Sequence, residues 1–416
     1  MRRVVLAPKA IREYEGLIGE EAVGAIEELA APLRGARVLH LNATAYGGGV
    51  AELLPSLVSL KRGLGLEVEW RVLSGASSFF ELTKRLHNGL QGMDVELELA
   101  HRALYLSTLE RNMEVFGRDW DFVVVHDPQP AGLVGLLDGR RTGHWIWRCH
   151  VDTSSPAAAA VEFLAPDIGS MDAAVYSMPE YAIPGLDPGR TEFVLPSIDP
   201  LTPKNQPLSR SLARQILAAR FGLDPDRPIV TQVSRFDPWK DPLGVIDAYR
   251  EVKRRVKDVQ LALVGNLAED DPQGGEYHAK TVQYAGSDPD IYIFSTLDLL
   301  SCDELTHALE INAFQSGSDV VVQKSTREGF GLVVAEAMWK RAAVVAGRVG
   351  GIVEQIEDGV NGYLVSNVEE CAERVGELLE KPALRQQMGA LARERVRERF
   401  ITPRHLADYL TLLRSF

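Results

Sequence analysis

Cysteine is scarce in this sequence, and long apolar runs are missing. The three cysteines, Cys149, Cys302 and Cys371, lie far apart, and none is part of a CxxC pair. This sparse, odd-numbered set argues against a disulfide framework and against a structural zinc site. No run reaches the roughly 18 apolar residues of a membrane-spanning helix, and the N-terminal residues lack the apolar stretch of a signal peptide. We therefore expect a cytoplasmic protein without a membrane partner.

Basic residues are outnumbered and are not clustered. Lys and Arg number 45 against 58 Asp and Glu, which gives a formal net charge of −13. Nucleic acids and anionic membranes require clustered Lys and Arg, so we predict neither as a partner. The composition, with 45% hydrophobic and 25% charged residues, excludes a disordered chain. An anionic ligand would have to be held locally, by a few cations and backbone amides.

Short apolar runs alternate with longer amphipathic stretches along the whole chain. The runs predicted as strands are 36–42, 67–74, 121–127, 143–152, 173–178, 192–197, 228–234, 259–265, 291–297, 319–325, 342–348 and 361–366. Several are near-continuous Val, Ile and Leu, which is typical of parallel strands buried on both faces. The stretches between them, such as 242–256, carry apolar residues at helical spacing. This alternation predicts an α/β protein with doubly wound sheets.

A segment in which prolines recur among polar residues, 198–208, separates two series of such runs. It cannot continue a helix or a central strand, so we interpret it as a linker between two domains. A chain of 416 residues is also longer than one hydrophobic core usually organises. We expect one Rossmann-like domain over residues 1–200 and a second over 208–399, facing a central cleft. A helix at about 400–416 is expected to pack back on the first domain.

Ligands of open α/β sheets bind at the carboxyl ends of the strands, so the residues that follow each predicted strand are candidate site residues. Three glycines, Gly47, Gly48 and Gly49, come before the helix that follows the run 36–42. Their backbone amides at a helix N-terminus are suited to a phosphate or a sugar. A flexible turn without a ligand is the alternative interpretation.

Imidazole, amide and carboxylate groups gather at the ends of two neighbouring predicted strands. They belong to His126, Asp127, Gln129, His150 and Asp152. Sugars need such groups because each buried hydroxyl must be paired. Ordinary hydrogen bonding within loops is the alternative, since Asp before Pro often begins a turn. No His-x₃-His spacing or carboxylate-rich triad supports metal binding, so we predict no metal site.

Two cations follow the first predicted strand of the second half. Arg235 and Lys240 lie five positions apart, across a predicted turn at the start of a helix. An arginine fork and a lysine point charge placed there would neutralise a diphosphate. Solubility alone accounts for most surface Lys and Arg, but the position at a predicted ligand-binding edge favours the functional interpretation.

Two glutamates flank a glycine-rich turn after the run 319–325. Glu328 precedes Gly329, Phe330 and Gly331, and Glu336 comes eight positions after Glu328, about one turn into the next predicted helix. The glycines leave amides free to face an anion at the helix N-terminus. One carboxylate can then reach sugar hydroxyls while the other reaches a ribose. A capping glutamate and a surface glutamate are the alternative.

These motifs together resemble the retaining glycosyltransferases of the GT-B fold, family GT4. The resemblance rests on Glu-x₇-Glu, Ser-Arg-x₄-Lys, the glycine loop and the segments 347–356 and 357–365. Three more segments, HDPQPAG, RCHVDTS and SRFDPWKDP, are similar to the trehalose-forming synthases of that family. At one position the chain departs from the common pattern, because Asp241 stands where glycine usually follows the lysine.

The resemblance implies the reversible transfer of glucose, with retention, from ADP-glucose, UDP-glucose or a related donor to free glucose, giving α,α-trehalose. It implies catalytic roles for Glu328, His150, Arg235 and Lys240. It places the donor against Gly47, Gly48, Gly49, Arg235, Lys240, Glu328, Gly329, Phe330, Gly331 and Glu336, and the acceptor against His126, Asp127, Gln129 and Asp152. No cofactor is required on this view, Mg²⁺ stimulation is left open, and a homodimer is the default assembly.

Three other functions stay open at this point. A trehalose phosphorylase would use free phosphate in place of a nucleotide, although Glu336, as a ribose ligand, favours the nucleotide sugar. A related transferase could use another sugar acceptor. A two-lobed sugar-binding protein without catalysis is the third, and a diphosphate-binding pair of cations counts against it.

Overall fold

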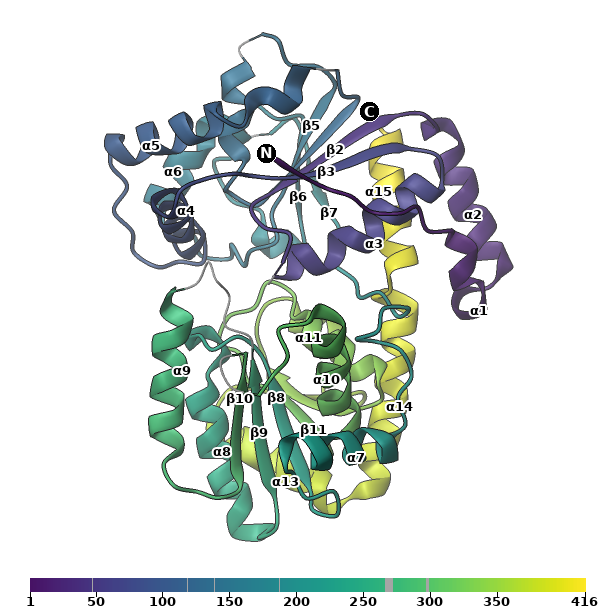
Figure 1. The fold of residues 1–416 in the computed structure, drawn as a ribbon, viewed down its shortest axis with the longest axis vertical. Coiled ribbons are helices and arrows are strands. Elements are labelled where there is room, and N and C mark those ends of the chain that lie inside the picture. The colour runs from purple at the N-terminus through teal and green to yellow at the C-terminus, as the bar shows by residue number, and fades with distance from the viewer. Residues whose placement is uncertain (47, 118, 138, 187, 266–271, 297–298) are drawn as a thin grey trace. The chain divides into compact units, whose positions relative to one another are not determined.

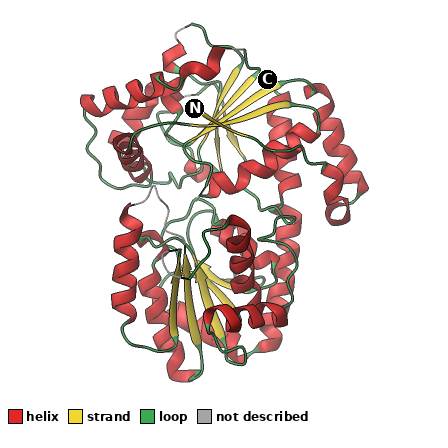
Figure 2. Ribbon diagram, in the orientation of Figure 1, coloured by secondary structure: helices red, strands yellow, loops and turns green. Residues whose placement is uncertain are grey.

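The computed structural model describes residues 1–46, 48–117, 119–137, 139–186, 188–265, 272–296 and 299–416. Contacts divide the chain into two compact units, Met1–Ser197 with Thr402–Phe416, and Ile198–Ile401. Each unit holds one sheet accompanied by helices (Figures 1 and 2). The last helix of the chain is thus part of the first unit.

The first unit is built on a seven-stranded sheet in the order β1-β3-β2-β4-β5-β6-β7. The strands are β1 (Arg2–Val4), β2 (Arg37–Asn42), β3 (Glu67–Val72), β4 (Phe122–His126), β5 (His144–Arg148), β6 (Ala173–Tyr176) and β7 (Thr191–Phe193). Only the β1–β3 pair is antiparallel within this sheet; the other pairs are parallel. Strand order reverses at β2, which lies between β3 and β4.

The two faces of this sheet differ in chemistry. Leu39 and Leu41 on β2 belong to the large apolar core of the unit, together with Val123 and Val125 on β4. Because side chains alternate along a strand, His40 lies on the opposite face. That face is bordered by helices α2, α3 and α15, and α15 contacts both α2 and α3 (Figure 1).

The helices of the unit are α1 (Glu15–Ile18), α2 (Glu20–Ala30), α3 (Gly49–Gly63), α4 (Ser77–Leu90), α5 (Leu99–Glu110), α6 (Ala158–Ile168) and α15 (Thr402–Arg414).

The second unit has a six-stranded, fully parallel sheet in the order β10-β9-β8-β11-β12-β13. Its strands are β8 (Ile229–Val233), β9 (Gln260–Gly265), β10 (Ile291–Ser295), β11 (Val320–Gln323), β12 (Ala343–Gly347) and β13 (Tyr363–Val365). This is the doubly wound order, and it reverses between β8 and β11. The helices are α7 (Arg210–Phe221), α8 (Pro242–Arg255), α9 (Pro272–Ala285), α10 (Glu304–Gly317), α11 (Leu332–Trp339), α12 (Ile352–Gln355), α13 (Val368–Glu380) and α14 (Pro382–Arg399).

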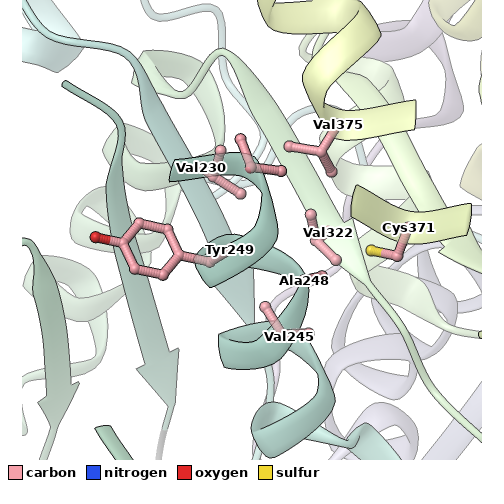
Figure 3. Close-up of a pocket in the computed structure, with 8 residues that line it drawn as sticks. Val230, Val245, Ala248, Tyr249, Val322, Cys371 and Val375 are labelled. Atoms are coloured by element: carbon pink, nitrogen blue, oxygen red, sulfur yellow. The ribbon is translucent and has the colours of Figure 1, made fainter. Parts of the chain in front are cut away.

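A small cavity of about 10 Å³ lies in the core of the second unit (Figure 3). It is lined by Val230, Val245, Ala248, Tyr249, Val252, Val322, Cys371 and Val375. A space of this size is about that of one water-sized sphere, and its walls are almost entirely apolar. The Tyr249 hydroxyl is turned away from Cys371 in Figure 3. We interpret the cavity as a packing defect between α8, α13 and the sheet rather than a ligand site.

The three cysteines differ in exposure, and this predicts their reactivity. Cys149 and Cys371 are buried, whereas Cys302 is exposed. Burial raises the pKa of the Cys371 thiol to about 12, and it also raises the pKa of Cys149. Because the thiolate is the reactive form, we expect an aromatic disulfide reagent to modify one thiol quickly in the native protein. The other two should react only in denaturant, and three fast thiols would contradict this assignment.

All twelve predicted strands are confirmed, with ends shifted by a few residues. Helices over 210–221 and 242–255 also match the expected elements. β1, a three-residue edge strand with the sequence RRV, is not among the strands predicted from the sequence. Across the described residues, no helix is both long and apolar enough to cross a bilayer.

Candidate active site

The candidate residues of the second unit come together where its strand order reverses. β8 and β11 are hydrogen-bonded neighbours, and each is followed by a loop that carries predicted site residues. The β8 loop holds Arg235 and Lys240, and the β11 loop holds Glu328. The carboxyl ends of strands at such a reversal point are where ligands bind in doubly wound sheets. The predicted pair of loops therefore lies at the expected edge of the sheet.

The two loops are fastened to each other by backbone and side-chain contacts. The Thr326 N–H donates to the Trp239 carbonyl oxygen at 2.8 Å. Within the first of these loops, the side-chain amide of Gln232 on β8 donates to the Lys240 carbonyl oxygen at 2.7 Å. In addition, the Arg327 guanidinium lies 5.7 Å from the centre of the Trp239 ring. The contacts of Thr326 and Arg327 with Trp239 hold the two loops against each other.

Lys240 and Glu328 form the central ion pair of the site. Nζ of Lys240 lies 2.5 Å from Oε2 of Glu328, and both side chains are largely buried, at 14% and 13% exposure. The Ser325 hydroxyl lies 3.2 Å from the same carboxylate oxygen. Arg235 is more open, with its guanidinium 3.5 Å from Oδ2 of Asp237. The loops that carry Arg235, Lys240 and Glu328 thus lie at one edge of the sheet, and the roles of these residues stay predictions.

The backbone explains the unusual aspartate after the lysine. Asp241 has φ of +48°, in the left-handed region that glycine adopts most readily. Its side chain offsets this strain by accepting a hydrogen bond from the Gly244 N–H at 3.1 Å, which caps α8. Its other oxygen pairs with Lys324. Asp241 therefore keeps the geometry of a glycine position while adding a helix cap and an ion pair.

The glycine-rich turn after Glu328 leads into α11. Gly331 precedes the helix with φ of +84°, and a Cβ there would lie 3.2 Å from Cγ of Glu328. Glycine is thus required at this position. Phe330 is buried, its ring centre lies 5.5 Å from that of Phe400, and its carbonyl oxygen accepts a bond from Gln355. Gly329 is half-buried beside it, so the turn is packed firmly against its neighbours.

Glu336 lies on α11 at the predicted depth, but it is only 2% exposed and its carboxylate is already paired. Oε1 lies 2.7 Å from Nζ of Lys204, and Oε2 lies 3.2 Å from the Gln315 amide nitrogen. Burial by itself would raise the pKa of Glu336, but Lys204 and Lys340 outweigh it and hold the pKa below its usual value. A ribose that bound here would have to share Glu336 with Lys204, which the sequence analysis had placed in a linker.

In the first unit, the candidate residues follow β2, β4 and β5, again where the strand order reverses. Gly48 precedes α3 in an extended conformation, and Gly49 is the first residue of that helix. A Cβ on Gly48 would meet no atom within 4 Å, so the backbone there is open. Gly47 lies outside the described residues. The described part of the glycine loop is thus a helix N-terminus with accessible amides.

Asp127 and His150 are joined directly. Asp127 has φ of +60°, a strained conformation for a residue other than glycine, and its Oδ1 accepts a bond from the His150 backbone N–H at 2.8 Å. Burial raises the pKa of Asp127 to about 6, against the opposing effects of the His150 N–H and Arg148. The buried Tyr105 hydroxyl donates to the Pro128 carbonyl oxygen at 2.7 Å, which holds the loop after β4.

Two of the other predicted acceptor contacts, Asp152 and Gln129, differ from each other. Asp152 is 4% exposed, and its Oδ1 accepts bonds from the Ser154 N–H and hydroxyl at 3.1 and 2.7 Å. This carboxylate oxygen of Asp152 is therefore already hydrogen-bonded within its own turn. Gln129 is half-buried, and the part of the chain that the structure describes offers its side-chain amide no hydrogen bond. Gln129 is therefore better placed than Asp152 to bind a new ligand.

Two residues that lie behind His126, His40 and Lys61, were not predicted as site residues from the sequence. His40 on β2 contacts His126, and Lys61 on α3 contacts His40 in turn; both are fully buried. The available signal was weak, because His40 lies inside an apolar run and Lys61 near the end of an apolar helix. Strand alternation could have placed His40 on the face that carries His126.

No cluster of the kind that holds a metal is found among the residues with described positions. Groups of three or more His, Cys, Asp and Glu side chains in a ligand arrangement are absent there. The buried histidines bond to one another through their ring nitrogens instead. Independence from metal remains a prediction.

Comparisons with known proteins give the fold and the family of the chain. A family model described as the N-terminal domain of trehalose synthase matches residues 40–183, and one described as glycosyl transferases group 1 matches residues 213–395. A solved structure titled "Trehalose-6-phosphate from E. coli bound with UDP-2-fluoro glucose" has a TM-score of 0.70 at 14% identity, over 92% of this chain and 99% of that one. At this identity the likeness shows the fold, which is that of the GT-B glycosyltransferases.

Closer relatives identify the family. The trehalose synthase of Rubrobacter xylanophilus is 52% identical over 99% of this chain and 98% of its own length. The trehalose synthase of Pyrococcus horikoshii is 44% identical over 98% and 96%. The chain belongs to the trehalose synthase family of glycosyltransferases. A trehalose phosphorylase of Pleurotus sajor-caju is more distant, at 27% identity over 87% of this chain and 55% of its own length.

Proposed function

We propose that this glycosyltransferase moves glucose from a nucleoside-diphosphate glucose to the anomeric hydroxyl of free glucose, giving α,α-trehalose reversibly and with retention. The observation that carries the proposal is the Lys240–Glu328 pair, with Arg235, at the strand-reversal edge of the second unit. Relatives named trehalose synthase over nearly their whole length support the sugar product.

The charges at this edge suit a departing nucleoside diphosphate. When the anomeric bond breaks, negative charge grows on the pyrophosphate, and preorganised cations stabilise that charge. Arg235 offers a planar fork and Lys240 a point charge. The N-terminus of α11, entered through Gly331, adds partial positive charge and backbone N–H donors. These groups supply the charge that a divalent ion supplies in other transferases, so we propose a metal-independent reaction.

Glu328 is a binding group rather than a nucleophile on this proposal. Its carboxylate is 2.5 Å from an ammonium and within hydrogen-bond distance of Ser325, and both contacts draw electron density from the oxygen that would attack. Glu328 can instead accept hydrogen bonds from hydroxyls of the transferred glucose. The acceptor then attacks from the face on which the diphosphate leaves, and a phosphate oxygen takes the acceptor's proton. Retention follows without a covalent intermediate.

The first unit supplies sugar contacts on this proposal. His150 lies in the loop after β5, and Asp127 accepts a hydrogen bond from its backbone N–H. Gln129 is available for hydroxyl contacts, and Gly48 and Gly49 open the α3 N-terminus to the donor. Asp152 contributes through the shape of its turn, because the oxygen described above is already bonded.

Product analysis with purified protein tests the proposal. Glucose with ADP-, UDP- or GDP-glucose should give trehalose and an equal amount of nucleoside diphosphate, and NMR should show both anomeric centres as α. The base that gives the highest initial rate identifies the donor. Excess chelator should leave the rate unchanged, because the site cations belong to the protein.

A parallel reaction separates the proposal from its alternatives. Trehalose formed only from glucose 1-phosphate and glucose, with release of phosphate, would establish a phosphorylase and overturn the nucleotide-sugar reaction. A panel of other sugars tests the acceptor. Transfer to one of them in preference to glucose would overturn the trehalose product while leaving the transferase chemistry intact.

A further inference from the structure

Four side chains of the first unit form one continuous hydrogen-bonded line, which we call the histidine chain: Lys61, His40, His126 and His150. Nζ of Lys61 lies 3.1 Å from Nε2 of His40. Nδ1 of His40 lies 2.9 Å from Nε2 of His126, and Nδ1 of His126 lies 2.9 Å from Nε2 of His150. Neighbouring rings are stacked, with centres 5.3 and 5.2 Å apart. The line crosses the sheet from α3 over β2 and β4 to the loop after β5.

Burial keeps the three rings uncharged. It lowers the pKa of His40, of His126 and of His150 well below the usual histidine value, and nearby cations lower these pKa values further. A neutral imidazole has one N–H donor and one acceptor nitrogen. Each ring must therefore donate in one direction along the line and accept in the other. The whole chain points one way or the opposite way.

Lys61 decides the direction, because a charged lysine has donors and no acceptor. With Lys61 protonated, Nε2 of His40 has to accept, so Nδ1 of His40 donates to His126. By the same logic Nδ1 of His126 donates to His150, which leaves His150 with its proton on Nδ1. No residue with a described position bonds to that Nδ1, and His150 is half-buried. The chain thus ends in an N–H donor available to a ligand.

Several aromatic and charged groups from other elements lie near Lys61 and the histidine chain. Its Nζ lies 4.4 Å from the centre of the Tyr409 ring on α15, a contact that favours the ammonium. Burial acts against the charge and lowers the pKa of Lys61 to about 7. His405 on α15 and Arg148 on β5 are the other basic groups near the chain, and Asp127 is the nearby acid. On β3, Glu69 pairs with Arg71.

We propose that Lys61, His40 and His126 are positioning residues that hold His150 in the Nδ1–H tautomer, so that it donates a hydrogen bond to an oxygen of the sugar substrate. The identity of that oxygen rests on the proposed function, whereas the tautomer does not. When Lys61 loses its charge, each hydrogen moves one place along the line. Lys61 gives its proton to His40, His40 gives one to His126, His126 gives one to His150, and Nδ1 of His150 releases one to water. His150 then presents an acceptor.

NMR of protein labelled with ¹⁵N-histidine tests the tautomers without any substrate. Near pH 6 we expect the signals of three neutral histidines that carry the proton on Nδ1. The single variant His150→Gln assigns these signals, because the His150 signals and those coupled to them are lost in it. Above pH 8 the same signals should change to the Nε2–H pattern together. Nε2–H tautomers near pH 6, or histidine signals that do not change between pH 6 and pH 8, would overturn the proposal. The tautomers and their pH dependence are measured on the wild-type chain, and the His150→Gln variant serves only to assign the signals.

Two variants of Lys61 test the consequence for catalysis. Lys61→Met removes the charge, and we expect kcat to fall about tenfold or more, since a wrong tautomer of a site histidine is costly. Lys61→Arg keeps a donor-only cation that stays charged at high pH. The wild-type kcat/KM should fall as pH rises through about 7, the pKa of Lys61, whereas Lys61→Arg should retain activity to higher pH.

Lys84→Met on α4 is the matched control, and it should leave the pH profile unchanged. Thermal unfolding of each variant distinguishes a loss of the fold from a change in the direction of the hydrogen bonds along the histidine chain. A Lys61→Met enzyme with wild-type kcat, or identical alkaline limbs for wild type and a folded Lys61→Arg, would overturn the proposal. If no trehalose forms but the Nδ1–H tautomers are present, the proposed function fails and the histidine chain stands.

Discussion

Replacing Lys240 by alanine is expected to reduce kcat/KM for the nucleotide sugar about 10²–10³-fold, the range seen when one preorganised group that stabilises transition-state charge is removed. The effect has two parts. The variant loses a cation beside the departing diphosphate, and it leaves Glu328 without the ammonium that lies 2.5 Å away. Initial rates over a range of donor concentrations measure the loss.

The matched control is Lys257→Ala, because Lys257 is an exposed lysine of the same unit. Its rate should stay within about twofold of wild type, as is usual for surface changes. Circular dichroism should show that both variants are folded. A Lys240→Ala enzyme with the kinetics of the control would show that this lysine does not serve the reaction, and the donor site would have to be placed elsewhere.

The change Glu336→Ala is expected to lower the free energy of unfolding of the second unit by about 3 kcal/mol at neutral pH, because removing one partner of a buried ion pair leaves the other uncompensated. Here the stranded groups are Lys204, 2.7 Å from the carboxylate, and Lys340. Denaturant unfolding measures the loss.

The pH dependence gives this prediction a second readout. The pKa of Glu336 is held below its usual value in the folded protein, so its stabilising contribution is present above the unfolded pKa. That contribution disappears as pH falls through the folded pKa. The difference between wild type and Glu336→Ala should therefore shrink in acid.

Glu373→Ala, which removes an exposed glutamate on α13, is the control and should change stability by a few tenths of a kcal/mol. The donor KM of Glu336→Ala distinguishes the two roles of this carboxylate. A raised KM with the loss of stability supports ribose binding in addition to the ion pair with Lys204. An unchanged KM would remove Glu336 from the donor site, and unchanged stability would contradict the buried pair.

The strands could be predicted because fully buried parallel strands appear in the sequence as short apolar runs. All twelve of the runs that were predicted as strands form strands. Site residues at strand ends followed from the same rule. Lys240 and Glu328 do meet at the reversal point, and Arg235 lies in the same loop as Lys240, because neighbouring parallel strands bring their carboxyl ends together. Local pattern and tertiary arrangement agree at these positions.

The features that were missed depend on contacts between residues distant in sequence. The three-residue β1 pairs antiparallel with β3 at an edge and has too few residues for a pattern. Lys61 has the spacing of an ordinary helix-end lysine, and only folding places it on His40. Likewise Lys204 lies among prolines and turns, yet it pairs with Glu336 on α11. No local signal distinguishes such residues from solvent-exposed ones.

Helix α15 has a consequence for the order in which the protein matures. It supplies Tyr409 beside Lys61, and His405, whose ring lies 3.0 Å from the Ser197 hydroxyl. During translation these residues leave the ribosome only after the whole second unit has been made. Until then the polar face of the first sheet lacks the part of its cover that α15 provides, next to Lys61 and the three imidazoles. A released chain that ends before residue 402 should therefore hold a finished second unit and an unfinished first one, the reverse of simple vectorial folding.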